Sequence, residues 1–284
     1  MIDASTRLIA LIGHPVEHSL SPRMHNVIYR HMDINGVYMA FDVLPENVGQ
    51  AVHGFRALQI RGFNVTVPHK QAVMPYLDAT DRTASVIGAV NTVVNDSGVL
   101  TGYNTDSSGF MRSLEYRGID VRGRDVLLLG AGGAARAVAT ALAMHGAGRV
   151  TIANRTPDKA AALADDINNY VGGSVCSGAP LSDIGSISCP YMLVNATSAG
   201  MWPHVESCPL PADYDLSGVA VAYDLIYNPE RTLLLKKAEE HGCMPVNGLD
   251  MLIWQAIEAI GIWFDIEVKY ELALKGIKNI ENFS

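Results

Sequence analysis

The chain has 284 residues, and its hydrophobic content of 49% is enough to build true cores in about two domains. Its formal net charge of −8 at pH 7 argues against nucleic acid or an anionic membrane as a partner. The four cysteines show no C-x-x-C spacing and the N-terminus shows no signal peptide, so we expect reduced thiols and a cytoplasmic protein.

Strands and helices alternate over the first 106 residues. The hydrophobic pattern predicts strands at 8–12, 37–43, 62–67, 90–94 and 99–103, and helices at 22–31 and 47–58, with helical patterns from 68 to 86. The segment Asn95-Asp96-Ser97-Gly98 predicts a hairpin between the last two strands. A further helix is expected from about residue 107 to residue 116.

A glycine-rich turn follows the next predicted strand, 126–129. The sequence there reads Gly130-Ala131-Gly132-Gly133-Ala134-Ala135, and an alanine-rich helix, 134–145, comes next. Gly130 permits the tight turn, Gly132 lets the backbone approach a pyrophosphate, and the helix N-terminus offers N–H groups to phosphates. Because another apolar strand, 150–153, follows, the pattern predicts a Rossmann-type dinucleotide site rather than a plain glycine-rich turn.

The residues after that second strand bear on the choice of dinucleotide. NAD sites usually place an acid there for the ribose 2′-hydroxyl, whereas this chain has Asn154-Arg155-Thr156 and then Pro157-Asp158-Lys159. Arg155 could bond a 2′-phosphate, with Thr156 and Lys159 assisting. Alternatively, Thr156 caps a helix that starts at Pro157, and Asp158 could still meet a 2′-hydroxyl. The pattern favours NADP, and NAD is the less favoured alternative.

The rest of the chain continues the alternation, with strands expected at 191–195 and 219–225 and helices at 232–241 and 251–264. This pattern predicts an α/β protein of two α/β domains built on parallel sheets, with a cleft between them. We expect a substrate-binding catalytic domain made of 1–106 plus 248–284, and an NADP-binding Rossmann domain made of 107–247.

Four polar runs lie at the ends of consecutive elements: Ser19–Pro22, Asn64–Lys70, Gly88–Thr92 and Gly102–Asp106. Each run alone is explained by capping or turn chemistry, including a cap at the serine before Pro22 and another at Asp106. Together they predict one polyhydroxylated, anionic ligand, for which a lysine and an aspartate form a proton-transfer pair.

Several other polar residues have simpler interpretations. His69 is expected at the surface rather than as a base, and His25 is expected to pack on its helix. The spacing of His14 and His18 is interrupted by Pro15, so no metal site is expected. Gln255 differs, because an amide within an apolar helix needs a hydrogen-bond partner.

Taken in order, these runs resemble the shikimate/quinate dehydrogenase family. The matching segments cover nearly the whole chain: 19–22, 64–70, 88–92, 104–106, 130–135, 154–156, 195–201, 224–229 and 248–255. The resemblance implies reversible, NADPH-dependent reduction of 3-dehydroshikimate to shikimate, on the chorismate route to aromatic amino acids. A small-molecule substrate is therefore the expected partner, and a homodimer is one option for the assembly.

The resemblance also implies roles for single residues. Ser19 and Ser21 would hold the substrate carboxylate, and Lys70 with Asp106 would handle the proton. Substrate contacts would further include Asn64, Thr66, Asn91, Tyr227 and Gln255. Cofactor contacts would be Gly130, Ala131, Gly132, Gly133, Ala134, Asn154, Arg155, Thr156, Lys159, Thr197, Met201, Gly248 and Met251.

The chain departs from the family pattern at two positions. Lys159 stands where many NADP-dependent members carry a second arginine, which weakens the 2′-phosphate clamp. Leu20 stands where many shikimate-specific members carry a lysine. The form Ser-Leu-Ser-Pro instead resembles the branch of the family that also accepts quinate. The alternatives are thus a dual shikimate/quinate dehydrogenase using NAD or NADP, or a catalytically idle dinucleotide sensor. The Lys70–Asp106 pair argues against the sensor, because a sensor needs no proton-transfer pair.

Overall fold

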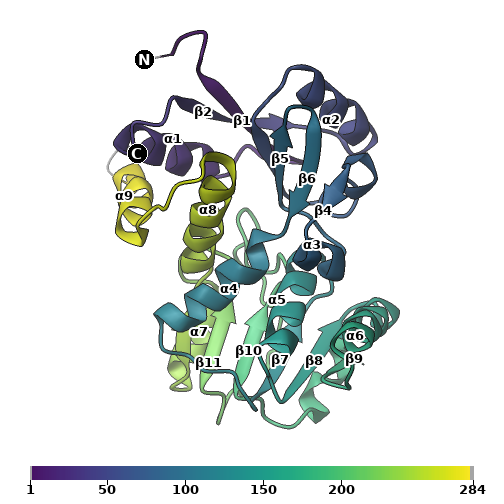
Figure 1. Ribbon diagram of the computed structural model, residues 1–284. Coiled ribbons are helices and arrows are strands. Elements are labelled where there is room, and N and C mark those ends of the chain that lie inside the picture. The colour runs from purple at the N-terminus through teal and green to yellow at the C-terminus, as the bar shows by residue number, and fades with distance from the viewer. Residues whose placement is uncertain (1, 282–284) are drawn as a thin grey trace. The chain divides into compact units, whose positions relative to one another are not determined.

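The computed structural model describes residues 2–281, which form two compact units (Figure 1). Among the described residues, the first unit comprises 2–109 and 253–281, and the second comprises Phe110–Leu252. Both boundaries fall inside helices, α4 (Thr105–Tyr116) and α8 (Leu249–Phe264), whereas the sequence pattern placed them at residues 106 and 247.

The first unit has a mixed sheet in the order β2-β1-β3-β5-β6-β4. Its strands are β1 (Arg7–Gly13), β2 (Gly36–Asp42), β3 (Gly62–Val65), β4 (Ala79–Thr80), β5 (Thr92–Asp96) and β6 (Val99–Tyr103). β1 runs parallel to β2 and β3, whereas β5 runs antiparallel to β3 and β6. The expectation of a wholly parallel sheet is therefore wrong here. The predicted hairpin is the reason, because a tight turn can join only antiparallel neighbours.

Six helices contribute to the first unit among the described residues. They are α1 (Ser21–His31), α2 (Val48–Ala57), α3 (Arg82–Ile87), part of α4, part of α8, and α9 (Tyr270–Glu281), which the sequence pattern missed. Val52 and Phe55 of α2 join Ile12 and Phe63 of the sheet in one buried cluster. In the predicted helical stretch 68–86, a short 3-10 helix (Met74–Tyr76) and α3 are helical and β4 lies between them, since Pro68 and Pro75 interrupt the helical hydrogen-bond pattern.

The second unit has a six-stranded parallel sheet in the order β12-β11-β10-β7-β8-β9. Its strands are β7 (Asp125–Leu129), β8 (Arg149–Asn154), β9 (Cys176–Pro180), β10 (Met192–Asn195), β11 (Val221–Asp224) and β12 (Met244–Val246). This is the doubly wound order of dinucleotide-binding domains, with its switch point where β7 and β10 are neighbours. β9 was not predicted because its residues, Cys-Ser-Gly-Ala-Pro, form no apolar run, and β12 was not predicted because it has only three residues.

Alternate residues of β7 divide the core of the second unit in two. Val126 and Leu128 pack in the cluster that contains α5 (Gly133–Met144) and α6 (Pro157–Val171). Leu127 and Leu129 pack in a second cluster that contains α7 (Leu233–Glu240). Burial of each such side chain contributes about 1.5–3 kcal/mol, which fixes the glycine turn after β7 on a rigid strand. Within residues 2–281, every helix is too short or insufficiently apolar to span a membrane.

Candidate functional site

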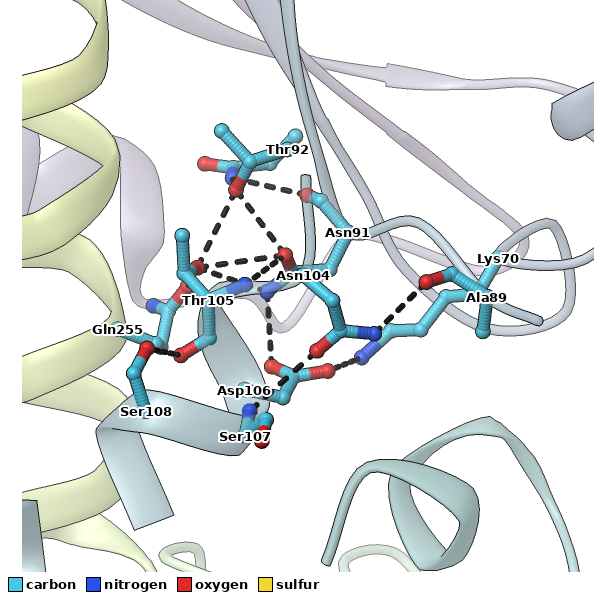
Figure 2. Close-up of polar contacts among 11 residues, drawn as sticks. Lys70, Ala89, Asn91, Thr92, Asn104, Thr105, Asp106, Ser107, Ser108 and Gln255 are labelled. Atoms are coloured by element: carbon cyan, nitrogen blue, oxygen red, sulfur yellow. Dashed lines mark hydrogen bonds and ion pairs between the residues drawn. The ribbon is translucent and has the colours of Figure 1, made fainter. Parts of the chain in front are cut away.

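The closest polar contact of the predicted site joins Lys70 to Asp106. Lys70 Nζ lies 2.5 Å from Asp106 Oδ2, and the two side chains are 13% and 9% exposed (Figure 2). Asp106 lies within the first turn of α4, where the helix dipole favours a carboxylate. It is therefore not the helix cap that was considered, and Asn104 Oδ1 accepts the hydrogen bond from the Ser107 N–H instead.

Asn91 holds the other oxygen of this carboxylate. Its Nδ2 donates to Asp106 Oδ1 at 2.9 Å and to Thr105 Oγ1 at 3.0 Å, while its Oδ1 accepts from the Thr105 N–H at 2.8 Å (Figure 2). Both amide hydrogens are thus committed within the protein. Asn91 therefore orients the carboxylate of Asp106.

Asn64 is held just as firmly, by a residue that the sequence pattern missed. The Tyr38 hydroxyl donates to Asn64 Oδ1 at 2.7 Å, and Asn64 Nδ2 donates to Thr92 Oγ1 and to the Asn91 carbonyl. Tyr38 is 1% exposed, and burial raises the pKa of its hydroxyl far above the ordinary value. The only sign in the sequence that Tyr38 supports Asn64 was the presence of a tyrosine within the predicted strand 37–43.

The two serines lie at the start of α1. Leu20 occupies the cap position, no side chain caps the helix, and the Ser21 N–H donates to Ser19 Oγ at 3.3 Å. The prediction of a serine cap is therefore wrong, because Ser21 is already the first helical residue. Thr66, just past β3, is half-buried.

Gln255 and Tyr227, the remaining predicted substrate residues, lie in different units. Gln255 on α8 accepts from Thr105 Oγ1 at 3.5 Å, which places it at the polar cluster around Asp106 (Figure 2). The required partner for this amide is thereby found. Tyr227 belongs to the second unit, in the segment after β11.

Two histidines of the first unit are fully buried. His69 is not a surface residue as predicted, because its Nε2 lies 2.6 Å from the Val43 carbonyl and its ring is enclosed. His25 packs as expected, stacked on the Tyr38 ring at 4.1 Å between centroids. Neither ring nitrogen of His25 has a partner among the described residues, and burial lowers its pKa to about 3.

The glycine turn of the second unit is shaped for a diphosphate. Gly130 has φ of +109°, a conformation that favours glycine. A Cβ added at Gly132 would meet nothing within 4 Å, so the backbone there is open to a close ligand. Ala131, Gly133 and Ala134 are half-buried where α5 begins, and the first N–H groups of that helix lack helical partners. These features fit a bound dinucleotide.

The end of β8 carries the groups predicted for the 2′-phosphate. Arg155, Thr156 and Lys159 are exposed, and Asn154 Nδ2 donates to the Thr156 carbonyl at 2.9 Å. Thr156 does occupy the cap position of α6, but its hydroxyl makes no capping bond there. The hydroxyl and the two cations therefore suit a phosphate.

The other predicted cofactor residues differ in exposure. Thr197 is half-buried and Met201 is 47% exposed in the segment after β10. Met251, by contrast, packs in the core cluster with α5 and α6. A Cβ added at Gly248 would lie 2.0 Å from the Leu225 carbonyl oxygen, so chain packing alone requires glycine there.

Known proteins similar to this chain match it in both units. Residues 11–93 match the family model of the shikimate dehydrogenase substrate binding domain, and residues 114–183 match that of shikimate / quinate 5-dehydrogenase. A shikimate dehydrogenase (NADP(+)) from Moorella thermoacetica is 50% identical over 271 residues, which is 92% of this chain and 89% of that protein.

Solved structures give the same result. A crystal structure of a shikimate dehydrogenase in complex with NADP+ has a TM-score of 0.90 and 43% identity, covering 100% of this chain and 98% of that one. A quinate dehydrogenase from Corynebacterium glutamicum in complex with NAD has a TM-score of 0.88 and 33% identity, covering 96% and 99%. The chain therefore belongs to the shikimate dehydrogenase family.

Proposed function

We propose that this protein catalyses the reversible, NADP-dependent reduction of 3-dehydroshikimate to shikimate. The observation that carries the proposal is the Lys70–Asp106 pair, held at 2.5 Å inside a cluster of buried amides and hydroxyls. Membership of the shikimate dehydrogenase family supports the same substrate class. An idle dinucleotide sensor would not need this pair.

The proton chemistry follows from the donors at Lys70. NADPH, when bound, supplies a hydride to the ketone carbon of the substrate. The ketone oxygen then becomes an alkoxide and needs a proton as it forms. An ammonium has three N–H donors, of which Lys70 gives one to Asp106 in the described structure, so two are left for the substrate oxygen. Asp106 orients the ammonium through this hydrogen bond, and the lysine is left as a neutral amine once its proton has passed to the alkoxide.

The hydroxyl groups of the substrate would meet acceptors. Both amide hydrogens of Asn64 are taken by Asn91 and Thr92, and one lone pair of its Oδ1 is taken by Tyr38. One lone pair is left, so Asn64 would accept a hydrogen bond from a ring hydroxyl rather than donate one. Asp106 has acceptor capacity as well. The site would therefore select ligands that place hydroxyl donors at these points.

The carboxylate of the substrate would lie at Ser19 and Ser21. Two hydroxyls beside the start of α1 offer donors, and the helix N-terminus adds a favourable dipole. Leu20, between them, supports a second candidate function, a dual shikimate/quinate dehydrogenase. Quinate has an extra hydroxyl on the carbon that bears its carboxylate, and an uncharged residue leaves this position less restrictive.

The cofactor would be held by the second unit, with its diphosphate at Gly130–Gly133 and its 2′-phosphate at Arg155, Thr156 and Lys159. The guanidinium of Arg155 is exposed just past β8, at the point where NAD sites usually place an acid, which supports NADP over NAD. We also propose a cytoplasmic location, in keeping with four free cysteines, and a homodimer as one assembly to be checked by light scattering.

An assay with four substrate–cofactor pairs tests the proposal. Shikimate and quinate are each supplied with NADP+ or NAD+, and formation of reduced nicotinamide is followed by its absorbance. We expect the highest kcat/KM for shikimate with NADP+. Faster turnover of quinate or NAD+ would establish the dual enzyme instead, and no turnover of any pair would exclude both dehydrogenases.

A further inference from the structure

Two buried polar side chains close neighbouring strands at the carboxyl edge of the second sheet. Asn195 ends β10 and Asp224 ends β11, and the two residues are register partners. Both are 0% exposed. Since the switch point lies where β7 and β10 are neighbours, the segment that leaves Asn195, residues 196–201, borders the crevice where such sheets bind ligands.

Asp224 is a buried carboxylate whose partners are all uncharged. Its Oδ1 accepts from Asn195 Nδ2 at 2.9 Å and from the Ile226 N–H at 3.1 Å, and its Oδ2 accepts from Thr232 Oγ1 at 2.7 Å. No ion pair to it occurs within residues 2–281. Burial raises its pKa to about 6, while the hydrogen bonds from Thr232, Ile226 and Asn195 favour the ionised form. Such a charge persists only where fixed donors surround it.

The donors of Asp224 shape the segment 196–201 from one side. Asn195 Oδ1 accepts from the Thr197 N–H at 3.0 Å and from Thr197 Oγ1 at 2.7 Å, while its Nδ2 also reaches the Ala199 carbonyl at 3.3 Å. The carboxamide has one orientation that satisfies all of these bonds, and its bond to Asp224 selects that orientation. A change at Asp224 is therefore felt at Thr197.

Thr232 bounds the same segment from the other side. Its hydroxyl donates to Asp224 and accepts from the Leu235 N–H, which makes it the cap of α7. A Cβ added at Gly200 would lie 3.5 Å from Thr232 Cβ, so the turn at Gly200 packs against this cap. Asp224 thus ties together the segment after β10, its own strand end and the start of α7.

We propose that Asp224 is a positioning residue that holds the segment 196–201 in the shape that receives the nicotinamide half of the dinucleotide. Asp224 is enclosed and acts through Asn195 and Thr197 rather than by touching the cofactor. This inference rests on the proposed NADP-dependent function. It assigns the adenine half to Arg155 and Lys159, which Asp224 does not influence.

The test compares two ligands in binding experiments. Adenosine 2′,5′-bisphosphate carries the 2′-phosphate but no nicotinamide, whereas NADP+ carries both. Asp224→Asn keeps the shape but replaces charge-assisted hydrogen bonds with weaker neutral ones and turns one acceptor into a donor facing Thr232. We expect its Kd for NADP+ to rise about five-fold or more while its Kd for the bisphosphate changes less than two-fold, by calorimetry. Asp213→Asn, an exposed acid of the same unit, should change neither value.

The outcomes separate this inference from the proposed function. A wild-type protein that binds neither ligand would refute the proposed function itself. Equal weakening of both ligands by Asp224→Asn, or no weakening of either, would overturn the positioning role. If Asp224→Asn does not fold, Thr232→Val replaces it in the test. That variant removes one of the three donors to Asp224 and should also weaken NADP+ binding while leaving bisphosphate binding unchanged.

Discussion

Lys70 and Asp106 meet at 2.5 Å although 36 residues separate them in the chain, and Asn91 fixes the second oxygen of the same carboxylate. An exposed pair of this kind contributes about 0–1 kcal/mol and is free to rearrange. Here both side chains are largely buried and the carboxylate is held from two directions. The lysine is therefore presented to a ligand in one orientation, which is what a proton donor requires.

The choice of cofactor depends on Arg155. A charge-assisted hydrogen bond contributes about 1.5–3 kcal/mol, so Arg155→Ala should weaken NADP+ binding about 10- to 150-fold and leave NAD+ binding nearly unchanged. Arg149→Ala, at the opposite end of β8, is the matched control. Equal losses for both cofactors, measured as Kd, would show that Arg155 has a structural role instead.

The serine pair should act on substrate affinity alone. Replacing Ser19 and Ser21 together by Ala removes two hydroxyl donors from the start of α1 and leaves the second unit unchanged. We expect KM for shikimate to rise about ten-fold or more, as for two lost hydrogen bonds to a charged group, with Kd for NADP+ unaffected. An unchanged KM would place the carboxylate elsewhere.

Tyr38 and Tyr29 form a matched pair for testing the support of Asn64. Tyr38→Phe removes the donor to Asn64 Oδ1, and we expect a loss of about 1–3 kcal/mol in unfolding free energy together with a higher KM. The Tyr29 hydroxyl is buried and has no partner among the described residues, so Tyr29→Phe should cost nothing. Similar effects of the two variants in urea unfolding would contradict the role of Tyr38.

His25 should make the fold sensitive to acid. Because burial lowers its pKa to about 3, the unfolded chain takes up the proton first as the pH falls. Above the pKa of histidine in the unfolded chain, about 6.5, the neutral His25 imidazole does not reduce the free energy of unfolding. Below that pH, the free energy of unfolding falls by about 1.4 kcal/mol per pH unit. His25→Phe should reduce this slope between about pH 6 and pH 4, whereas His31→Phe, exposed on the same helix, should retain it. Identical slopes would contradict this explanation.

Local patterns in the sequence sufficed for the parts of the molecule that depend on neighbours in the chain. The strand–glycine–helix unit at Gly130 and the hairpin at 95–98 both formed as predicted. The environment of His69 was predicted wrongly, because a single polar residue after a proline gives no sign that Val43 will cover it. The roles of Tyr38 and Asp224 depend on which strands become neighbours, and sheet order is not encoded in any one segment.

The rate constant of Lys70→Met tests the central claim most directly. Methionine keeps the length of the side chain but has no proton to give. The variant should fold and bind NADP+ normally, while kcat for shikimate falls by about 10²- to 10⁴-fold. Asp106→Asn should also lower kcat, and the double variant should lose much less than the product of the two effects, since the residues act as a unit. A Lys70→Met protein that retains more than about a tenth of the wild-type kcat would contradict the assignment of Lys70 as proton donor.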